Sequence, residues 1–466
     1  MTSPSLLEAL YIAALLSARR DLSYRTRAMV IARALSLGPD SAASIEALYQ
    51  AFRDSGLVLD RSWRPYRTQA DAAKAKAEQW SRRGVYIIPA RSIKAPDASR
   101  HNLPEVLFAR GDPLILDEEA ACIVNSRKAR RVDPNDPWIP ATISLFQLAS
   151  KRVRTFVSSY GTLSYGLVST LTQRSPHSLV IVCDGVLPFM EASERVEDFL
   201  ERHEDLFSPN HTLFLSPYPP GSLPPAPARW KERDGLVVAL SSQVFVAAIR
   251  KGGTMDEIVR TACTRPIDIV VMQPEKITPT TSGNLRVLNH PSVARIEPIS
   301  IQTQPHPAEE SGDVFRGSVQ PKRRDLRLRE WPEQGSHLIH YTRSCSCPWP
   351  GQTWGAYCKS LIDHREDAAH TGFHTLLHIL EEGRIRASHR LTRGAVPVVS
   401  FTECLPRELE GIMKWRRGLI RWSFEPYGIG VAKEALLHLG VSRVIYGDED
   451  DFRNVPQDDK CLFQLR

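Results

Sequence analysis

The sequence predicts an α/β protein whose central part folds around a parallel β-sheet with helices on both faces. Short β-branched runs alternate with helical stretches between residues 104 and 300, which is the pattern of strands joined by helical crossovers. The runs that contain Cys122 and Cys183 are apolar, as expected of strands covered on both sides. The chain has 466 residues, more than one hydrophobic core usually organises, so two or three domains are expected.

A small helical unit is expected at the N-terminus, over residues 1–84. Apolar residues recur at helical spacing over 4–54, and a further helix is expected over about 67–82. The short strand Val85–Ile88 then leads into the sheet domain, residues 85–300.

Strands and helices alternate in the sheet domain. The predicted strands are Ala121–Val124, Thr155–Val157, Leu179–Cys183, His211–Leu215, Val244–Ala248 and Ile267–Met272. The predicted helices between them cover about 140–152, 161–173, 190–204, 229–240 and 254–264. Helical crossovers make the strands parallel, so this domain should be Rossmann-like and bind its ligand at the carboxyl ends of the strands.

The C-terminal third is expected to form a separate α+β domain. Residues 301–335 hold few apolar side chains and are predicted to be a linker, and the domain follows over 336–466. It should contain the helix Phe373–Glu382. Its predicted strands include Val396–Phe401, Leu419–Phe424 and Arg443–Tyr446.

Charge and cysteine usage narrow the choice of partner and compartment. The formal net charge is +7 and the sequence pI about 9.0, a balance that favours an anionic partner. The apolar run Leu6–Leu16 is too short to span a bilayer. Eight scattered cysteines indicate neither a disulfide framework nor a zinc site. We therefore expect a cytoplasmic protein with no membrane partner and no metal.

Three loops that directly follow predicted strands carry residue types that bind phosphate. Val124–Arg127 offers a hydroxyl and a guanidinium, and Ser158–Gly161 opens a helix whose unpaired N–H groups favour an anion. Lys251–Thr254 adds a cation, a hydroxyl and two glycines, which would let the backbone approach a phosphate closely. All three loops should meet at one edge of the sheet.

The same loops belong to a series of motifs over about 85–275 that resembles the DprA-like family of the SLOG superfamily. The matching segments are Leu107–Asp112 (L-F-x-R-G-(ND)), Val124–Arg127 (V-G-S-R), Ser158–Tyr165 (S-G-x-A-x-G-I-D), Leu215–Gly221 (S-E-x-P-P-G), Lys231–Ser241 (R-N-R-I-I-(AS)-G-L-S) and Lys251–Thr254 (S-G-(ST)-x-x-T). The chain departs from the family at two points. Asn125 stands where V-G-S-R has glycine, and the loop Ser158–Tyr165 lacks the arginine that the family uses there to bind phosphate.

The resemblance implies a Rossmann-like domain that binds single-stranded DNA, RNA or a nucleotide and that forms a homodimer. The candidate phosphate-binding residues are Ser126, Arg127, Ser158, Ser159, Gly161, Arg233, Lys251, Gly252, Gly253 and Thr254. A second resemblance, to lysine-decarboxylase-like phosphoribohydrolases, rests on Arg233 and the run Gly252–Glu257. It would make Glu257 catalytic in N-glycosidic cleavage, whereas the alternative is that Glu257 only stabilises its helix N-terminus, by about 0.3–1 kcal/mol.

The C-terminal domain resembles the AbiGi-type abortive-infection family. The matching segments are His340–Thr342, Ile379–Ile385, Pro397–Phe401, Tyr427–Lys433 and Arg443–Tyr446. The layout also resembles a distant ADP-ribosyltransferase, which would use NAD. That resemblance assigns the NAD-contacting histidine to His340 and the catalytic glutamate to either Glu403 or Glu425. The alternative is a domain whose aromatic residues form a core or a surface for a partner protein.

These resemblances lead to one hypothesis and two alternatives. The leading hypothesis is a bacterial antiphage-defence protein in which the sheet domain binds nucleic acid or a nucleotide and the C-terminal domain acts as effector. The first alternative is an enzyme that acts on NAD or on nucleotides. The second is a scaffold that binds a partner protein through its C-terminal domain.

Overall fold

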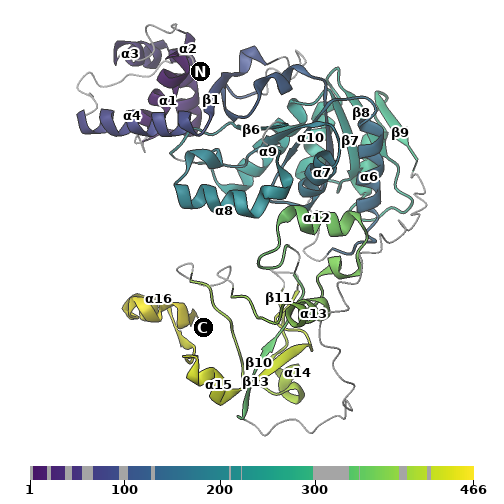
Figure 1. Cartoon of the computed structure of the whole chain (residues 1–466). Coiled ribbons are helices and arrows are strands. Elements are labelled where there is room, and N and C mark those ends of the chain that lie inside the picture. The colour runs from purple at the N-terminus through teal and green to yellow at the C-terminus, as the bar shows by residue number, and fades with distance from the viewer. Residues whose placement is uncertain are drawn as a thin grey trace. The chain divides into compact units, whose positions relative to one another are not determined.

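The computed structural model describes residues 4–17, 22–36, 45–54, 67–93, 103–126, 132–208, 211–221, 223–297, 335–345, 347–387, 396–416 and 421–465. These residues form two compact units (Figure 1). The first unit takes the described residues within Met1–Lys128, Asn135–Ile299 and Thr353–His364, and the second those within Ala129–Pro134, Ser300–Gln352 and Arg365–Arg466.

The first unit is built on a nine-stranded sheet in the order β1-β2-β6-β5-β4-β3-β7-β8-β9. The strands are β1 (Val85–Pro89), β2 (Val106–Arg110), β3 (Ala120–Asn125), β4 (Thr155–Ser159), β5 (Ser178–Val182), β6 (Thr212–Ser216), β7 (Gln243–Ala248), β8 (Asp268–Met272) and β9 (Val293–Ile296). Neighbours from β6 to β9 pair in parallel, while β2 pairs antiparallel with both β6 and β1. The predicted α/β fold with a largely parallel sheet is therefore confirmed, and the antiparallel edge is an addition that the sequence pattern did not predict.

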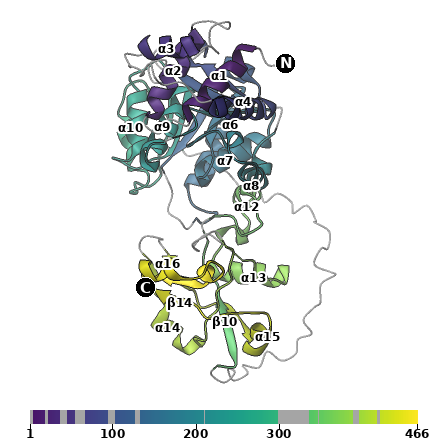
Figure 2. The same cartoon turned by 90° about the vertical axis from the view of Figure 1, so that its left-hand side faces the viewer.

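Helices cover both faces of this sheet. They are α1 (Pro4–Ser17), α2 (Tyr24–Ser36), α3 (Ile45–Asp54), α4 (Arg67–Arg82), α6 (Trp138–Ala149), α7 (Leu163–Gln173), α8 (Ser193–His203), α9 (Ala226–Ala239), α10 (Thr254–Ala262), α11 (Ser282–Leu288) and α12 (Trp354–Ile362). Alternate residues of one strand serve the two faces: Leu179 and Ile181 join the core with α6 and α7, and Val180 joins the core with α9 and α10. Figure 2 shows α9 and α10 on one side of the sheet and α6, α7 and α8 on the other.

The N-terminal helices share a core with the sheet. Trp80 of α4 is buried, and its indole N–H donates to the carbonyl of Met190 (3.0 Å). The hydroxyl of Tyr218 donates to one carboxylate oxygen of Glu232 (2.7 Å), and the hydroxyl of Tyr24, on α2, donates to the other. The N-terminal helices are thus fixed to the sheet unit by buried apolar contacts and by a shared carboxylate.

Helix α12 comes from the C-terminal third of the chain but packs on α7 of the sheet unit. The prediction placed these residues in the C-terminal domain. Tyr357, Cys358 and Leu361 are fully buried. Gly166 on α7 makes this approach possible, since a Cβ there would lie 2.8 Å from the sulfur of Cys358. The chain therefore leaves the second unit before α12, contributes this helix to the first unit, and returns to the second unit after it.

The second unit consists of short strand pairs and helices. Its elements are β10 (His337–Tyr341), α13 (Gly372–Glu382), α14 (Leu409–Ile412), β11 (Trp415–Arg416), β12 (Arg421–Trp422), β13 (Gly428–Ala432), α15 (Lys433–His438), β14 (Ile445–Gly447), α16 (Glu449–Asn454) and β15 (Phe463–Leu465). The predicted helix Phe373–Glu382 is present as α13, whereas 396–401 forms no named strand. It lies beside β10, because a bridge joins the next residue, Thr402, to Ile339 and His340 bonds the carbonyl of Ser400. Among the described residues, no helix is both long and apolar enough to cross a lipid bilayer.

A buried aromatic stack joins three parts of the second unit. The indole of Trp349 lies between the imidazoles of His370 and His378, with ring centroids 3.7 and 4.2 Å apart. His370 is 1% exposed, and burial lowers its pKa from 6.5 to about 4. The neutral imidazole is therefore the form that this packing accepts.

The contact between Gly166 and Cys358 predicts that Gly166→Ala lowers the free energy of unfolding by about 1–2 kcal/mol, because overpacking costs about 1–3 kcal/mol and the better helix propensity of alanine offsets about 1 kcal/mol. In a Cys358→Ala background the same change should be neutral or stabilising, since the sulfur is gone. Urea unfolding of the four proteins of this cycle measures the coupling. Equal effects in both backgrounds would contradict the close contact.

The burial of His370 predicts that the second unit loses stability as the pH falls from 6.5 to 4. The unfolded histidine takes up a proton near 6.5 and the folded one near 4, so the unfolded state binds more protons in this window. The full difference amounts to about 3 kcal/mol. His370→Asn, which tolerates the left-handed backbone found there (φ 44°), should flatten this part of the pH profile. Thermal melts followed by tryptophan fluorescence test this, and an unchanged slope would contradict it.

Candidate phosphate-binding site

The sheet has one topological switch point, at β3, within the described residues. β3 pairs with β4 on one side and with β7 on the other. The chain continues from β3 through α6 to β4, and from β7 through α10 to β8, so the two crossovers leave in opposite directions. In open parallel sheets this arrangement opens a crevice at the carboxyl ends of the strands. The three loops predicted to bind phosphate follow β3, β4 and β7.

The loop after β3 is bound directly to the loop after β7. The N–H of Ser126 donates to the carbonyl of Ala248 (2.9 Å), and its Oγ accepts from the N–H of Arg250 (2.8 Å). The hydroxyl of Ser126 thus positions Arg250, a residue that the sequence pattern did not single out. Arg127 lies outside the described residues.

The two serines at the end of β4 face the interior. Ser158 and Ser159 are buried, and their hydroxyls donate to the carbonyls of Tyr165 (3.1 Å) and Val182 (2.6 Å). Their hydroxyls therefore connect β4 with α7 and β5, and are not available to a ligand. What remains exposed in this loop is Gly161, whose φ of +78° favours glycine.

Helices α7 and α10 present unpaired N–H groups at this edge. In the described residues, no hydrogen bond uses the first-turn amides of α7 (Leu163–Tyr165) or of α10 (Thr254–Asp256). Neither helix has a side chain that caps its N-terminus. Such amides, together with the positive end of the helix dipole, favour an anion.

The backbone N–H groups in the loop after β7 are already hydrogen-bonded within the protein. The N–H of Lys251 donates to Oγ of Ser282 (3.2 Å), that of Gly252 to a carboxylate oxygen of Asp256 (2.8 Å), and that of Gly253 to the carbonyl of Arg250 (3.2 Å). The amides of Gly252 and Gly253 therefore already have acceptors within the protein. No atom lies within 4 Å of where a Cβ of Gly252 would be, so space does not require glycine here. The φ of +71° does, because side chains disfavour this backbone conformation.

Asp256 occupies the position that an anion would take in this loop. It is 1% exposed and forms an ion pair with Arg286 of α11 (3.2 Å). Arg250, Lys251 and Thr254 surround the loop with exposed side chains. An incoming phosphate would therefore meet two exposed cations and the free first-turn amides of α10, and not the amides of the loop.

Helix α11 holds this loop in place. Asn284 is fully buried. Its Oδ1 accepts from the N–H of Ile249 (2.8 Å), and its Nδ2 donates to the carbonyls of Ala247 (2.9 Å) and Met272 (2.8 Å). The preceding Gly283 packs so tightly on this turn that a Cβ would lie 2.9 Å from the carbonyl oxygen of Ile249. The run Ser282–Asn284 was missed, although a Ser-Gly-Asn sequence at a helix start is a recognisable signal.

Arg233 is buried and forms ion pairs with two carboxylates. Its guanidinium lies 2.8 Å from a carboxylate oxygen of Asp234 and 3.8 Å from one of Asp184, and it stands over the ring of Tyr165. The hydroxyl of Tyr165 donates to the same oxygen of Asp234 (2.7 Å), and burial and that carboxylate raise the pKa of Tyr165 well above its usual range. Arg233, predicted to contact phosphate, is therefore already neutralised.

Each predicted catalytic residue has a partner within the protein. Glu257 is exposed and paired with Lys231 (2.8 Å). His340 bonds the carbonyl of Ser400 (2.9 Å), and burial lowers the pKa of His340. Glu403 is exposed and paired with Lys433 (2.6 Å).

Glu425 has a structural role in the second unit. Its carboxylate accepts from the backbone N–H groups of Ser344 (2.6 Å) and Gly372 (3.1 Å). A Cβ at Gly372 would lie 2.7 Å from the same carboxylate. Glu425 therefore joins the segment after β10 to the start of α13. No group of three or more histidine, cysteine or carboxylate side chains able to hold a metal occurs in the part of the chain that the structure describes.

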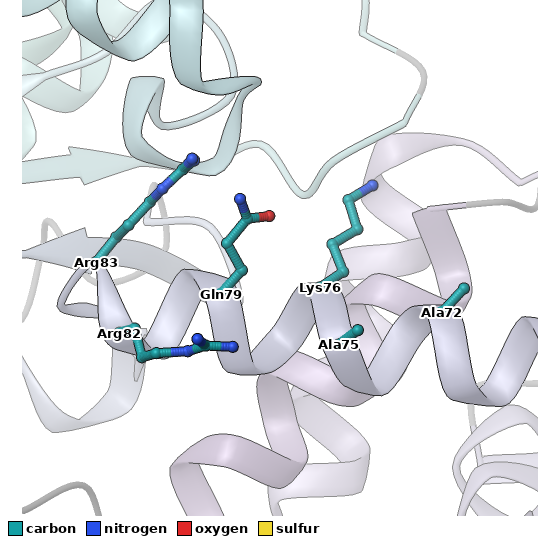
Figure 3. Close-up of a pocket in the computed structure, with 6 residues that line it drawn as sticks. All are labelled: Ala72, Ala75, Lys76, Gln79, Arg82 and Arg83. Carbon is teal, nitrogen blue, oxygen red and sulfur yellow. The ribbon is translucent and has the colours of Figure 1, made fainter.

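A hollow of about 720 Å³ lies elsewhere, on the surface of α4. It is lined by Ala72, Ala75, Lys76, Gln79, Arg82 and Arg83. Lys76, Gln79 and Arg83 extend from the same side of the helix (Figure 3). The guanidinium of Arg83 is occupied by the carbonyls of Phe189 (3.2 Å) and Glu191 (2.6 Å). This hollow is beside the antiparallel edge of the sheet and takes no part in the switch-point site.

The fold is similar to those of two solved structures of DNA processing protein A. The X-ray structure of the protein from Streptococcus pneumoniae matches with a TM-score of 0.39 and 13% identity, over 59% of this chain and 93% of that one. The structure from Helicobacter pylori, described in terms of its single-stranded DNA binding mode, matches with a TM-score of 0.33 and 20% identity, over 45% of this chain and 93% of that one. No known family and no curated protein matches the sequence. Both TM-scores lie below 0.5, so neither similarity shows what this chain binds.

The role of Asn284 predicts that Asn284→Asp lowers the free energy of unfolding by about 3 kcal/mol or more, because a carboxylate cannot donate to the two carbonyls it would face. Amide hydrogen exchange at Ile249–Gly253 should also accelerate. The exposed Asn454 of the second unit provides the control, since Asn454→Ala should change stability by no more than about 0.5 kcal/mol. Unchanged exchange at Ile249 in the Asn284 variant would contradict the proposed support.

Proposed function

We propose that the first unit binds single-stranded nucleic acid at the carboxyl edge of its parallel sheet. The observation that carries the proposal is the position of Arg250 and Lys251, two exposed cations, beside the free first-turn amides of α10 at the switch point. Groups of this kind bind phosphate through charge and through N–H donors, without reading base sequence.

A ligand with several phosphates suits this edge better than one with a single phosphate. The amides of α7 follow β4 and those of α10 follow β7, and β3 lies between these two strands. The strand ends are therefore about 10 Å apart, two strand spacings. Two anion sites at that separation fit the repeating phosphates of a nucleic acid strand. The excess of Lys and Arg over Asp and Glu in the whole chain, 60 against 53, supports a polyanionic partner.

The resemblance of the sequence motifs to the DprA-like family supports the same ligand class. Single-stranded DNA is the ligand named for the Helicobacter pylori protein, which makes DNA the first strand to test. The predicted defence role, the effector role of the second unit and the homodimer remain proposals that rest on the sequence resemblances alone. The proposal assigns no catalytic role to the three glutamates: Glu257 and Glu403 are exposed and paired, and Glu425 accepts from two backbone amides.

Removal of the two cations tests this proposal. Arg250→Ala/Lys251→Ala should weaken binding of fluorescein-labelled oligothymidylate. It should also lower the slope of log affinity against log salt by about 1.4, since each phosphate contact to a single strand contributes about 0.7. Fluorescence anisotropy at several salt concentrations measures both quantities. The loss should be similar for strands of different sequence, because the contacts are to phosphate.

A matched control lies at the opposite edge of the same sheet. Lys151 and Arg152 are adjacent, exposed cations that precede β4. Lys151→Ala/Arg152→Ala removes the same charge from the amino edge and should leave the salt slope nearly unchanged. Equal losses in the two double variants would show non-specific attraction to a basic surface and would sink the proposal.

A further inference from the structure

Two tryptophans in the second unit lie exposed on a short β-hairpin. Trp415 of β11 is 48% exposed and Trp422 of β12 is 43% exposed. The two residues are directly opposite each other in the antiparallel pair, and their ring centroids lie 5.6 Å apart with the planes inclined by 74°. By contrast, Trp80 and Trp349 are 1% and 7% exposed. Indole surface of this extent is costly to leave in water and marks a binding surface.

The hairpin holds the two indoles in a fixed register. The N–H of Ser423 donates to the carbonyl of Lys414 (2.9 Å), and the N–H of Lys414 donates to Oγ of Ser423 (3.0 Å). The same hydroxyl donates to the carbonyl of Ile412 (3.3 Å). These bonds close the hairpin next to the Trp415–Trp422 pair. Edge-to-face packing of the rings covers part of each indole and leaves the rest available to a ligand.

Two cationic residues flank the first tryptophan of the hairpin. Lys414 and Arg416 flank Trp415, both are exposed, and no acidic side chain in the described part of the chain pairs with either. Because side chains alternate along a strand, the hairpin has one aromatic and one cationic face.

We propose that this hairpin is a single-stranded nucleic-acid contact in which bases stack on Trp415 and Trp422 while Lys414 and Arg416 bind the adjacent phosphates. Aromatic rings next to cations are the chemistry that single strands require, because every base has a face to stack and every nucleotide carries a charge. The site is in the second unit and is independent of the proposed site at the sheet edge.

Tryptophan fluorescence provides a local readout. An oligothymidylate of about 15 nucleotides should quench the indole emission of the full-length protein, whereas an abasic strand of equal length, which has the same phosphates, should bind without this quenching. Trp415→Ala/Trp422→Ala should abolish most of the quenching and weaken oligothymidylate binding about 30-fold or more, since stacking contributes about 1–3 kcal/mol per base and the variant removes two stacking rings. Trp415→Phe/Trp422→Phe keeps two stacking faces and the hairpin, and should retain affinity within a few fold.

Two further variants separate base stacking from a general apolar contact and from charge attraction. Trp415→Leu/Trp422→Leu keeps an apolar surface without a ring and should behave like the alanine pair. Lys414→Ala/Arg416→Ala leaves both rings in place and should weaken the oligothymidylate and the abasic strand alike. Arg250→Ala/Lys251→Ala should lower affinity without changing the quenching at saturation, so failure of the sheet-edge site is distinguishable from failure of the hairpin.

Three outcomes would overturn the proposal. The first is unchanged quenching and affinity in the alanine pair. The second is full retention of binding in the leucine pair, which would indicate an apolar contact such as a protein partner. The third is quenching by vesicles that contain phosphatidylserine and not by oligonucleotides, which would indicate a membrane contact.

Discussion

The arrangement of the first unit depends on the parallel pairing of β3 with β7. This pairing joins residues 120–125 to residues 243–248 and makes β3 the strand from which the two halves of the sheet extend in opposite directions. It places the loop of Ser126 against the loop of Arg250, and their backbone and hydroxyl hydrogen bonds fix both. The switch point and the exposed cations beside it are consequences of that one pairing, because crossovers on either side of it must diverge.

The loop after β7 shows how a site can keep its shape without a ligand. The carboxylate of Asp256 bonds the amide of Gly252, Arg286 balances its charge, and Asn284 holds the turn from the other side. A loop with satisfied amides does not need an anion to be stable. The phosphate affinity that we propose therefore comes from Arg250, Lys251 and the helix N-termini. It should depend on salt more than an enclosed phosphate cradle would.

Helix α12 anchors part of the C-terminal third of the chain on the first unit. Its buried face packs on α7, and α7 begins at the loop that carries Gly161. The same helix thus bears the first-turn amides of the proposed site at one end and the docking position for α12 along its length.

The sequence by itself determined the fold class, the six central strands and the three loops that follow β3, β4 and β7, because strand and helix periodicity are local properties of the chain. Tertiary structure decided which of the predicted residues are exposed. Ser158, Ser159 and Arg233 carry suitable chemistry but are buried and bonded, whereas Arg250 is exposed in the loop after β7. It also placed α12 on the sheet unit through the space beside Gly166. Burial and partner choice depend on residues far apart in the chain, and no local pattern encodes them.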